Sequence, residues 1–142
     1  MQNAPITVKN FLKLVDQDFF KGIVFHRVIK DFMCQAGGYY IKDNTINEKR
    51  AESIYGEFES NGFKNDLKHV FGVISMARSM NPNSASSQFF ICYGDCTFLD
   101  GQYAAFGKVI EGMDIIDYIE RREAVNGDSL VQNLTLKKEI LK

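Results

Sequence analysis

The spacing of apolar residues predicts two helices, one near each end of the chain. At the start, apolar side chains recur at helical intervals, at Phe11, Leu12, Val15 and Phe19. Pro5 suits the first turn of a helix, where its missing N–H costs nothing, and Gly22 is a stop signal. The pattern therefore predicts a helix over residues 5–18. A second helix, beginning near Gly112, is predicted by the spacing of Met113, Ile115, Ile116 and Ile119.

Runs of β-branched and aromatic residues predict strands between and after these helices. The predicted strands are residues 24–29, 32–36, 71–77, 88–93, 103–109 and 131–140. Lys30-Asp31 is expected to form a tight turn between the first two strands, and Gly37-Gly38 to end that pair. Residues 39–68 are polar with weak periodicity, so a long functional loop is expected there. Short strands separated by turn signals favour a sandwich or a closed barrel.

Composition and charge fit a single globular domain over residues 1–142. Of the 142 residues, 45% are hydrophobic, which is enough for a core. Seventeen Lys and Arg nearly balance 18 Asp and Glu, so no global field draws the chain to nucleic acid or to an anionic membrane. The chain starts without a basic and then apolar leader, and no apolar run is long enough to span a bilayer. We therefore expect a soluble, cytoplasmic protein.

The cysteines and histidines do not predict a metal site. Cys34, Cys92 and Cys96 form no C-x-x-C pair, and the only histidines are His26 and His69. An odd cysteine count without regular spacing argues against a disulfide framework and against a zinc site. No phosphate-loop, dinucleotide-binding or Gly-x-Ser-x-Gly pattern is present either.

Arg27 is the unusual polar residue of the first predicted strand, because Phe25, Val28 and Ile29 around it are apolar. Two interpretations stay open. Arg27 is an outward-facing charge on an alternating strand, or it is a guanidinium at the edge of an apolar pocket. Its neighbour His26 is more readily a structural histidine than a general base, since a lone histidine in an apolar strand has no catalytic partner in sequence.

Three blocks of sequence carry a family pattern. The first block is Phe25-His26-Arg27-Val28-Ile29 followed by Phe32-Met33-Cys34-Gln35. The second runs from Phe71-Gly72-Val73-Ile74-Ser75-Met76-Ala77 to Ser87-Gln88-Phe89-Phe90-Ile91. The third contains Phe98-Leu99-Asp100-Gly101, Phe106-Gly107-Lys108-Val109 and Glu111-Gly112-Met113. In this order, over most of the chain, the blocks resemble the cyclophilins. The resemblance implies a mainly β fold, a cyclophilin-like barrel capped by two α-helices, and prolyl isomerase activity without a cofactor.

The resemblance also implies roles for individual residues. Arg27 takes the place of the family's catalytic arginine. The pocket for the proline ring matches Phe32, Met33, Phe90 and Leu99. Gln35 matches a group that positions the substrate backbone, and the adjoining groove matches Ala77, Arg78 and Gln88. His26 matches a residue that lines the site without acting as a base.

The chain departs from the family pattern at its start and within the site. Family members usually begin with two strands before the first helix, and we expect these two strands to be missing here, so that the last strand lacks its usual neighbour. Phe98 stands where a tryptophan is common, Tyr103 where several members carry histidine, and Arg78 where many carry asparagine. Because Phe98 lacks the indole N–H donor, weakened cyclosporin binding is expected.

The favoured function is an active isomerase that acts on proline-containing peptides and unfolded proteins. The alternative is a proline-peptide binding module with little or no catalysis, since the same groove can bind a peptide without turning it over. A barrel that binds single-stranded nucleic acid is disfavoured, because the 13% aromatic content comes without a basic stripe. No nucleic-acid or membrane partner, no metal and no cofactor is expected.

Overall fold

An antiparallel sheet and two helices make up the part of the chain that the computed structural model describes, residues 3–126. The helices are α1 (Pro5–Asp16) and α2 (Met113–Asn126). The strands are β1 (Ile23–Ile29), β2 (Met33–Lys42), β3 (Thr45–Glu48), β4 (Val73–Met76), β5 (Phe89–Cys92) and β6 (Ala105–Lys108). Two short 3₁₀ turns are η1 (Glu59–Asn61) and η2 (Thr97–Leu99). The mainly β class with two helices is therefore confirmed.

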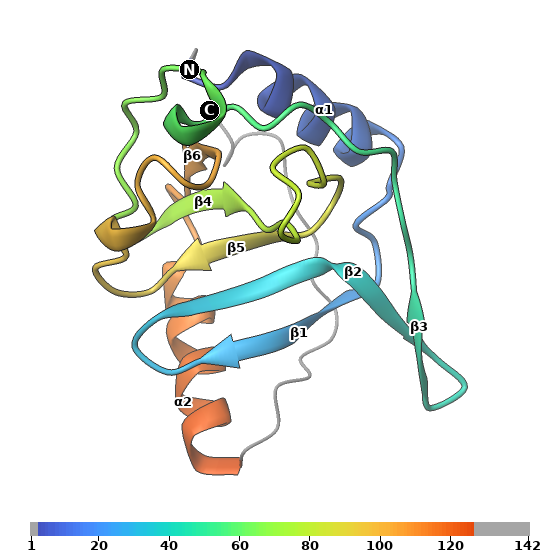
Figure 1. The fold of residues 1–142 in the computed structure, drawn as a ribbon. Helices are drawn as coiled ribbons and strands as arrows, with labels where there is room; N and C mark the ends of the chain where they lie inside the picture. Colours follow the sequence, from blue (N-terminus) through green and yellow to red (C-terminus); the bar gives the residue numbers. More distant parts are fainter. Residues whose placement is uncertain (1–2, 127–142) are drawn as a thin grey trace.

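The strands follow the order β1-β2-β5-β4-β6, and β3 pairs with the far end of β2 (Figure 1). Every pairing is antiparallel. Within residues 3–126 the path ends at β1 and β6, so the expected barrel is corrected here to an open sheet. The predicted last strand, residues 131–140, lies outside the described residues, and with it the expectation about the edge that this strand would leave.

The two faces of the sheet belong to two different apolar clusters. Successive side chains of a strand point to opposite faces, and along β5 the alternation is complete: Phe89 and Ile91 join the main core, whereas Phe90 and Cys92 join a second cluster. The main core also holds the helices, through Phe11 and Leu14 of α1 and Ile116 and Ile119 of α2. Because both faces are covered, β5 reads in the sequence as an unbroken apolar run.

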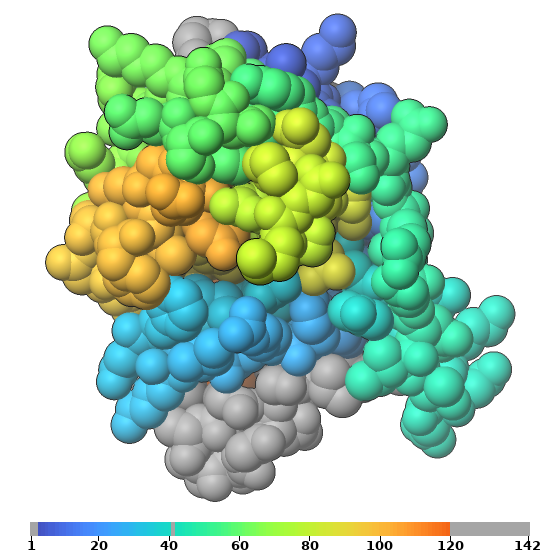
Figure 2. Space-filling view, in the orientation of Figure 1, coloured from blue at the N-terminus to red at the C-terminus, as the bar shows by residue number. Residues whose placement is uncertain are grey.

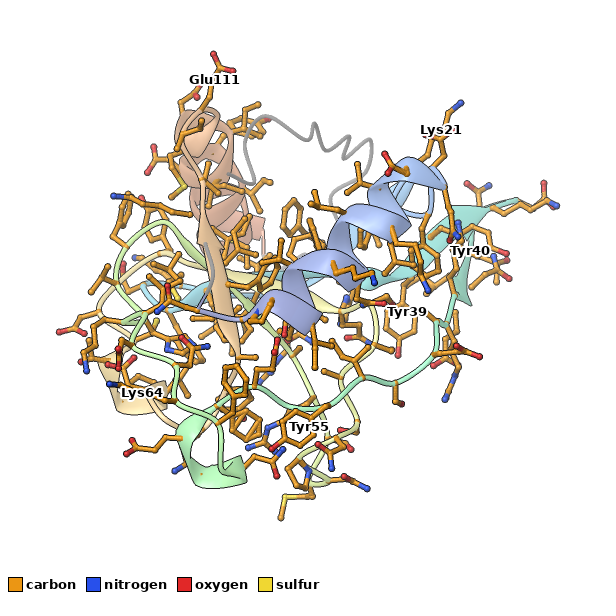
Figure 3. All side chains as sticks on the ribbon, turned by 90° about the horizontal axis from the view of Figure 1, so that it is seen from above. Lys21, Tyr39, Tyr40, Tyr55, Lys64 and Glu111 are labelled. Carbon is orange, nitrogen blue, oxygen red and sulfur yellow. The ribbon has the colours of Figure 1, made fainter. Side chains whose placement is uncertain are left out.

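Helix α1 is fixed to the core by aromatic contacts. The Phe11 ring lies 5.3 Å from the Phe89 ring in a T-shaped arrangement and 4.9 Å from the Phe20 ring. In the view from above (Figure 3), Lys21 lies beyond the C-terminal end of α1. In the same view, Tyr55 and Glu111, which lies shortly before α2, are on opposite sides of this helix. The helix matches the predicted span closely, ending two residues earlier than expected.

Gly37 and Gly38 do not end the second strand, contrary to expectation, because β2 continues through them to Lys42. Gly37 has a φ of 104°, a left-handed backbone conformation that glycine adopts readily because it has no Cβ atom. A Cβ atom there would lie 2.3 Å from the carbonyl oxygen of Ser87, whose hydroxyl donates to the Gly37 carbonyl oxygen at 2.7 Å. The glycine therefore marks a close approach of two backbones inside the sheet rather than a strand end.

Strand β3 lies inside the stretch that was expected to be a loop. It pairs with β2 across a two-residue turn, with Lys42 opposite Thr45. The turn residues Asp43 and Asn44 both adopt left-handed φ angles, 54° and 60°. Two consecutive left-handed residues are typical of the hairpin turn that matches strand twist, and Asp and Asn tolerate this conformation best after glycine. The Asp-Asn pair was the available signal.

The N-terminus of α1 is capped by a residue fifty positions away. Ala4 precedes the helix and offers no side-chain acceptor. Instead the buried carboxylate of Glu57 accepts hydrogen bonds from the backbone N–H groups of Ile6 and Thr7, at 3.1 and 2.7 Å, and from the Thr7 hydroxyl at 2.8 Å. A negative charge is favourable at this end of a helix.

Among the described residues, no helix has the length and apolar character required to cross a membrane.

We expect Glu57→Ala to lower the free energy of unfolding by about 2–4 kcal/mol, because it leaves two backbone donors and one hydroxyl without their acceptor. Urea unfolding with an unchanged m-value measures this loss. Glu52→Ala, which removes an exposed carboxylate from the same segment, serves as the control and should change stability by less than about 0.5 kcal/mol. Equal stabilities of the two variants would contradict the capping role.

Candidate functional site

Four strands place a row of side chains across one face of the sheet. Arg27 of β1 lies opposite Gln35 of β2, Gln35 lies opposite Phe90 of β5, and Phe90 lies opposite Ser75 of β4. Directly paired residues point to the same face of an antiparallel sheet. The register therefore brings Arg27, Gln35 and Phe90, which are far apart in the sequence, onto one surface.

A bulge in β1 gives Arg27 this orientation. Phe25 pairs with Ala36 and Arg27 with Gln35, so β1 advances two residues where β2 advances one. With strict alternation Arg27 would share the face of Phe25, which points into the main core. The extra residue turns Arg27 to the opposite face, where it is exposed. Of the two interpretations of Arg27, the register therefore favours a guanidinium on the face of the second cluster.

An apolar cluster, here called the site cluster, lies on this face. Its buried members are Met33, Val73, Phe90, Cys92, Cys96 and Ala105. Its partly buried members are Phe32, Leu67, Ala77, Leu99 and Tyr103. The rings of Phe90 and Tyr103 meet edge to face with centroids 5.9 Å apart. The four residues predicted to hold a proline ring thus belong to one cluster, together with Ala77 and Tyr103.

Figure 2 shows how segments from distant parts of the chain meet on the front of the molecule, with residues near 25–35 in blue, near 75–88 in yellow-green and near 95–105 in orange. Phe98 lies at the rim, 69% exposed, with its ring 5.6 Å from that of Phe32. The rim is contributed by η2 and the residues after it, whereas the floor is contributed by the sheet.

A chain of side-chain amides borders the site cluster. The Nη1 of Arg27 donates to Oε1 of Gln35 at 3.4 Å, a long contact, and Nε2 of Gln35 donates to Oε1 of Gln88 at 2.9 Å. The carbonyl oxygen of Gln88 in turn accepts from the N–H of Ala77 at 3.0 Å. Arg27 is thus held loosely at the exposed end of a polar border, with hydrogen-bonding capacity available to a ligand.

His26, which is predicted to line the site, directly precedes Arg27 in β1 and contacts a ring that is not part of the site cluster. It is partly buried on β1, and its ring lies 4.6 Å from that of Tyr39 on β2. Burial lowers the pKa of His26 below its usual value, and the neighbouring charge of Arg27 lowers it further.

A buried network beneath Phe90 was not predicted from the sequence. The carboxylate of Asp100 accepts from the backbone N–H of His69 at 2.7 Å and lies 2.8 Å from His69 Nδ1. The Nε2 of His69 lies 2.8 Å from the Ser75 hydroxyl, and the His69 ring stacks on Phe90 with centroids 6.0 Å apart. His69 therefore connects the floor of the site, through Ser75 and Phe90, to the rim at Asp100, which directly follows Leu99.

The protonation of His69 follows from its partners. A carboxylate only accepts, so Nδ1 carries a proton for Asp100, and in the neutral ring Nε2 then accepts from the Ser75 hydroxyl. Burial lowers the pKa of His69, although the hydrogen bond and the charge of Asp100 act in the opposite direction. The folded protein therefore favours the neutral ring, in the tautomer that both neighbours can satisfy.

The cysteines of the site cluster are buried thiols. Burial is the largest cause of the raised pKa values of Cys92 and Cys96, and the proximity of Cys96 adds to the effect on Cys92. Both therefore remain protonated and serve as packing groups. In the described portion of the chain, no group of three His, Cys, Asp or Glu side chains is arranged to hold a metal ion.

Both the sequence and the structure are similar to those of known peptidyl-prolyl cis-trans isomerases. The family model described as cyclophilin type peptidyl-prolyl cis-trans isomerase/CLD matches residues 1–139. A peptidyl-prolyl cis-trans isomerase of Acinetobacter baylyi is 45% identical over 121 residues, which cover 82% of this chain and 61% of that protein. Peptidyl-prolyl cis-trans isomerase A of Dickeya dadantii is 42% identical over 130 residues, which cover 88% of this chain and 65% of that protein. The chain thus spans less than two thirds of the length of these two relatives.

Two further proteins are covered more fully. Peptidyl-prolyl cis-trans isomerase 10 of Caenorhabditis elegans is 40% identical over 142 residues, which cover 96% of this chain and 84% of that protein. A crystal structure of a cyclophilin type peptidyl-prolyl cis-trans isomerase from Cryptosporidium parvum superimposes with a TM-score of 0.65 at 31% identity. That match covers 83% of this chain and 72% of the other.

The lowered pKa of His69 predicts that stability falls on acidification. Below a pH of about 6.5, the usual histidine pKa, the unfolded chain takes up a proton that the folded chain resists, so the free energy of unfolding decreases. The slope from this one group cannot exceed about 1.4 kcal/mol per pH unit. Urea unfolding between pH 7.5 and pH 5.5 measures it.

His69→Gln is the matched variant, because it removes the titrating group and keeps hydrogen-bonding capacity. We expect it to be less stable than the parent at pH 7.5 and to lose less stability on acidification. The contribution of His26, whose pKa is also lowered, is common to both chains and cancels in the comparison. Parallel pH profiles would show that His69 does not contribute to the acid sensitivity.

Proposed function

The chain belongs to the cyclophilin type peptidyl-prolyl cis-trans isomerase family, and we propose that it accelerates rotation about X–Pro bonds in proline-containing peptides and unfolded proteins. The observation that carries the proposal is the row formed by Arg27, Gln35 and Phe90, with a permanent cation at the edge of an apolar cluster. This is the combination that the reaction requires.

The barrier to be lowered is that of the peptide C–N bond, about 18–20 kcal/mol, which resonance creates. As the bond twists, the lone pair of the prolyl nitrogen localises and becomes a hydrogen-bond acceptor. Arg27 is the proposed donor to it, since a guanidinium stays charged at all relevant pH values. The contact is strongest in the twisted state, and only such a contact accelerates the step.

The site cluster is the proposed seat of the proline ring. Phe32, Met33, Phe90 and Leu99 offer an apolar surface on which the ring is held while the preceding carbonyl rotates. Gln35, beside Arg27, is the proposed contact of the substrate backbone. No bond is made or broken, so the proposed mechanism requires neither nucleophile nor cofactor.

The proposal extends to the context of the protein. A single domain over residues 1–142 is supported by a family model that matches residues 1–139. A cytoplasmic location is supported by Cys34, Cys92 and Cys96, which are all buried and form no disulfide, as suits a reducing compartment. The near balance of charge supports peptides rather than nucleic acids or membranes as partners.

An isomerisation assay on a short peptide with one Ala–Pro bond tests the proposal. We expect the parent protein to catalyse cis–trans exchange and Arg27→Ala to lower kcat/KM by at least about tenfold, because one transition-state donor is lost. Exchange spectroscopy of the peptide measures the rate. Circular dichroism of the variant establishes that it is folded.

Lys30→Ala is the control, since it removes an exposed cation from the turn that follows β1 and should leave kcat/KM within about twofold. A folded Arg27→Ala variant with parental turnover removes Arg27 from the mechanism. A parent protein that binds the peptide without accelerating exchange is instead a proline-peptide binding module.

Phe98 predicts the response to cyclosporin. Its exposed ring lacks the indole donor that many family members present there, so we expect Phe98→Trp to bind cyclosporin about tenfold more tightly than the parent, the value of one hydrogen bond. Calorimetric titration measures both affinities. Phe71→Trp, at another exposed ring packed on Tyr93, is the control. Equal affinities for parent and Phe98→Trp would show that the ring face alone suffices.

A further inference from the structure

A polar groove of about 450 Å³ adjoins the site cluster. Gln35, Ala77 and Gln88 belong both to the border of the cluster and to the lining of the groove. The remaining lining comes from two segments, residues 48–53 and residues 78–87. A peptide seated on Phe90 therefore enters this groove with the residues on one side of its proline.

The charges of the groove are predominantly positive. Lys49, Arg50 and Arg78 are its cationic side chains, and Glu48 is its only carboxylate. Glu48 pairs with Arg50 at 2.9 Å. The ammonium of Lys49 donates to the carbonyl oxygen of Phe19 at 2.8 Å. Arg78 has no carboxylate among the ion pairs found within the described residues. A local positive field thus exists on a chain whose net charge is -1.

Arg78 is held in place by neutral groups. Its Nε and Nη2 donate to the carbonyl oxygen of Gln102 at 3.1 and 2.7 Å, and its Nη1 donates to that of Ser79 at 2.9 Å. The guanidinium carbon lies 4.8 Å from the ring centroid of Phe58 and 4.7 Å from that of Tyr103. Carbonyl groups and aromatic faces orient a guanidinium without cancelling its charge. The charge is therefore available to a ligand at little cost in side-chain entropy.

The position of this charge relative to the proline pocket is fixed by Tyr103. The centroid of the Tyr103 ring lies 4.7 Å from the guanidinium carbon of Arg78 and 5.9 Å from the centroid of the Phe90 ring. An extended chain advances about 3.3 Å per residue. A substrate residue two or three positions from the proline therefore comes within reach of the guanidinium when the proline ring lies on Phe90.

We propose that this groove selects substrates with an anionic side chain, a carboxylate or a phosphate, two or three residues from the isomerised proline, and that Arg78 is the residue that recognises it. The inference rests on the proposed isomerase function and adds a substrate class to it. Ser79 and Ser84, whose hydroxyls are 2.8 Å apart in the groove, offer neutral donors beside the charge.

A set of peptides with one Ala–Pro bond tests the proposal. The residue two or three positions before or after the proline is Glu, Gln or Lys, and a further pair carries phosphoserine or serine. The measured quantity is the ratio of kcat/KM for the acidic peptide to that for its neutral partner. On one side of the proline we expect a Glu/Gln ratio of about 2–5, which corresponds to the free energy of an exposed ion pair. The Lys/Gln ratio at the same position should be below one. At 0.5 M salt the Glu/Gln ratio should decrease, because salt screens the charges. The phosphoserine arm distinguishes a phosphate from a carboxylate preference.

Arg78→Gln should bring the Glu/Gln ratio close to one, whatever it does to the absolute rates. Lys64→Gln removes an exposed cation outside the groove and should preserve the parental ratio. Ratios near one on both flanks in the parent, or an unchanged ratio in Arg78→Gln, would overturn the inference while neutral peptides still turn over. Absence of turnover on every peptide would overturn the isomerase function and this inference together. If Arg78→Gln does not fold, the parental ratios and their salt dependence still test the anionic preference, and Arg78→Lys, which keeps the charge and should keep a Glu/Gln ratio above one, tests the position.

Discussion

The covering of both faces of the sheet is the constraint on which the site depends. Phe89 and Ile91 are locked in the main core with the helices, so Phe90 between them is held rigidly on the opposite face. A protein interior packs at crystal-like density and transmits position from one layer to the next. The T-shaped contact between Phe11 and Phe89 therefore contributes to the geometry of the proposed proline pocket, although no residue of α1 belongs to the site cluster. Strand β5 therefore contributes both to the stability of the main core and to the geometry of the site.

The bulge in β1 shows where a pattern of alternation stops being informative. Phe25 and Val28 both point into the main core, three positions apart, which no regular strand allows. The irregularity lies at His26 and Arg27 and has no composition signal of its own. Sequence periodicity therefore left the direction of Arg27 undecided, and only the pairing with Gln35 resolves it. Resemblance to the cyclophilins assigned Arg27 to the site without explaining why its side chain lies on that face.

Sequence reasoning succeeded where one local cause dominates and failed where distant segments meet. The first helix, the apolar strand β5 and the turn at Lys30-Asp31 follow from local pattern, and Asp31 adopts the left-handed φ of 61° that such a turn needs. The hairpin of β2 and β3 was missed because its outer strand is short and polar. Gly37 was misread because its requirement comes from Ser87, fifty positions away. The groove beside Arg78 was expected from the resemblance, whereas the contacts of its guanidinium with Phe58 and Tyr103 follow from no local pattern.

The network of Asp100, His69 and Ser75 has the composition and the hydrogen-bonding order of a serine hydrolase triad, yet its surroundings give it another use. A nucleophilic hydroxyl must reach a substrate carbonyl. Ser75 is fully buried, and the Phe90 ring, on the neighbouring strand, belongs to the same face. Its hydroxyl is committed to His69 and has no path to a ligand. In a site with the proposed isomerase function, which twists a bond without breaking one, a nucleophile has no role, whereas a fixed floor does. The triad-like network is better understood as the support that joins the floor of the site at Ser75 and Phe90 to its rim at Asp100.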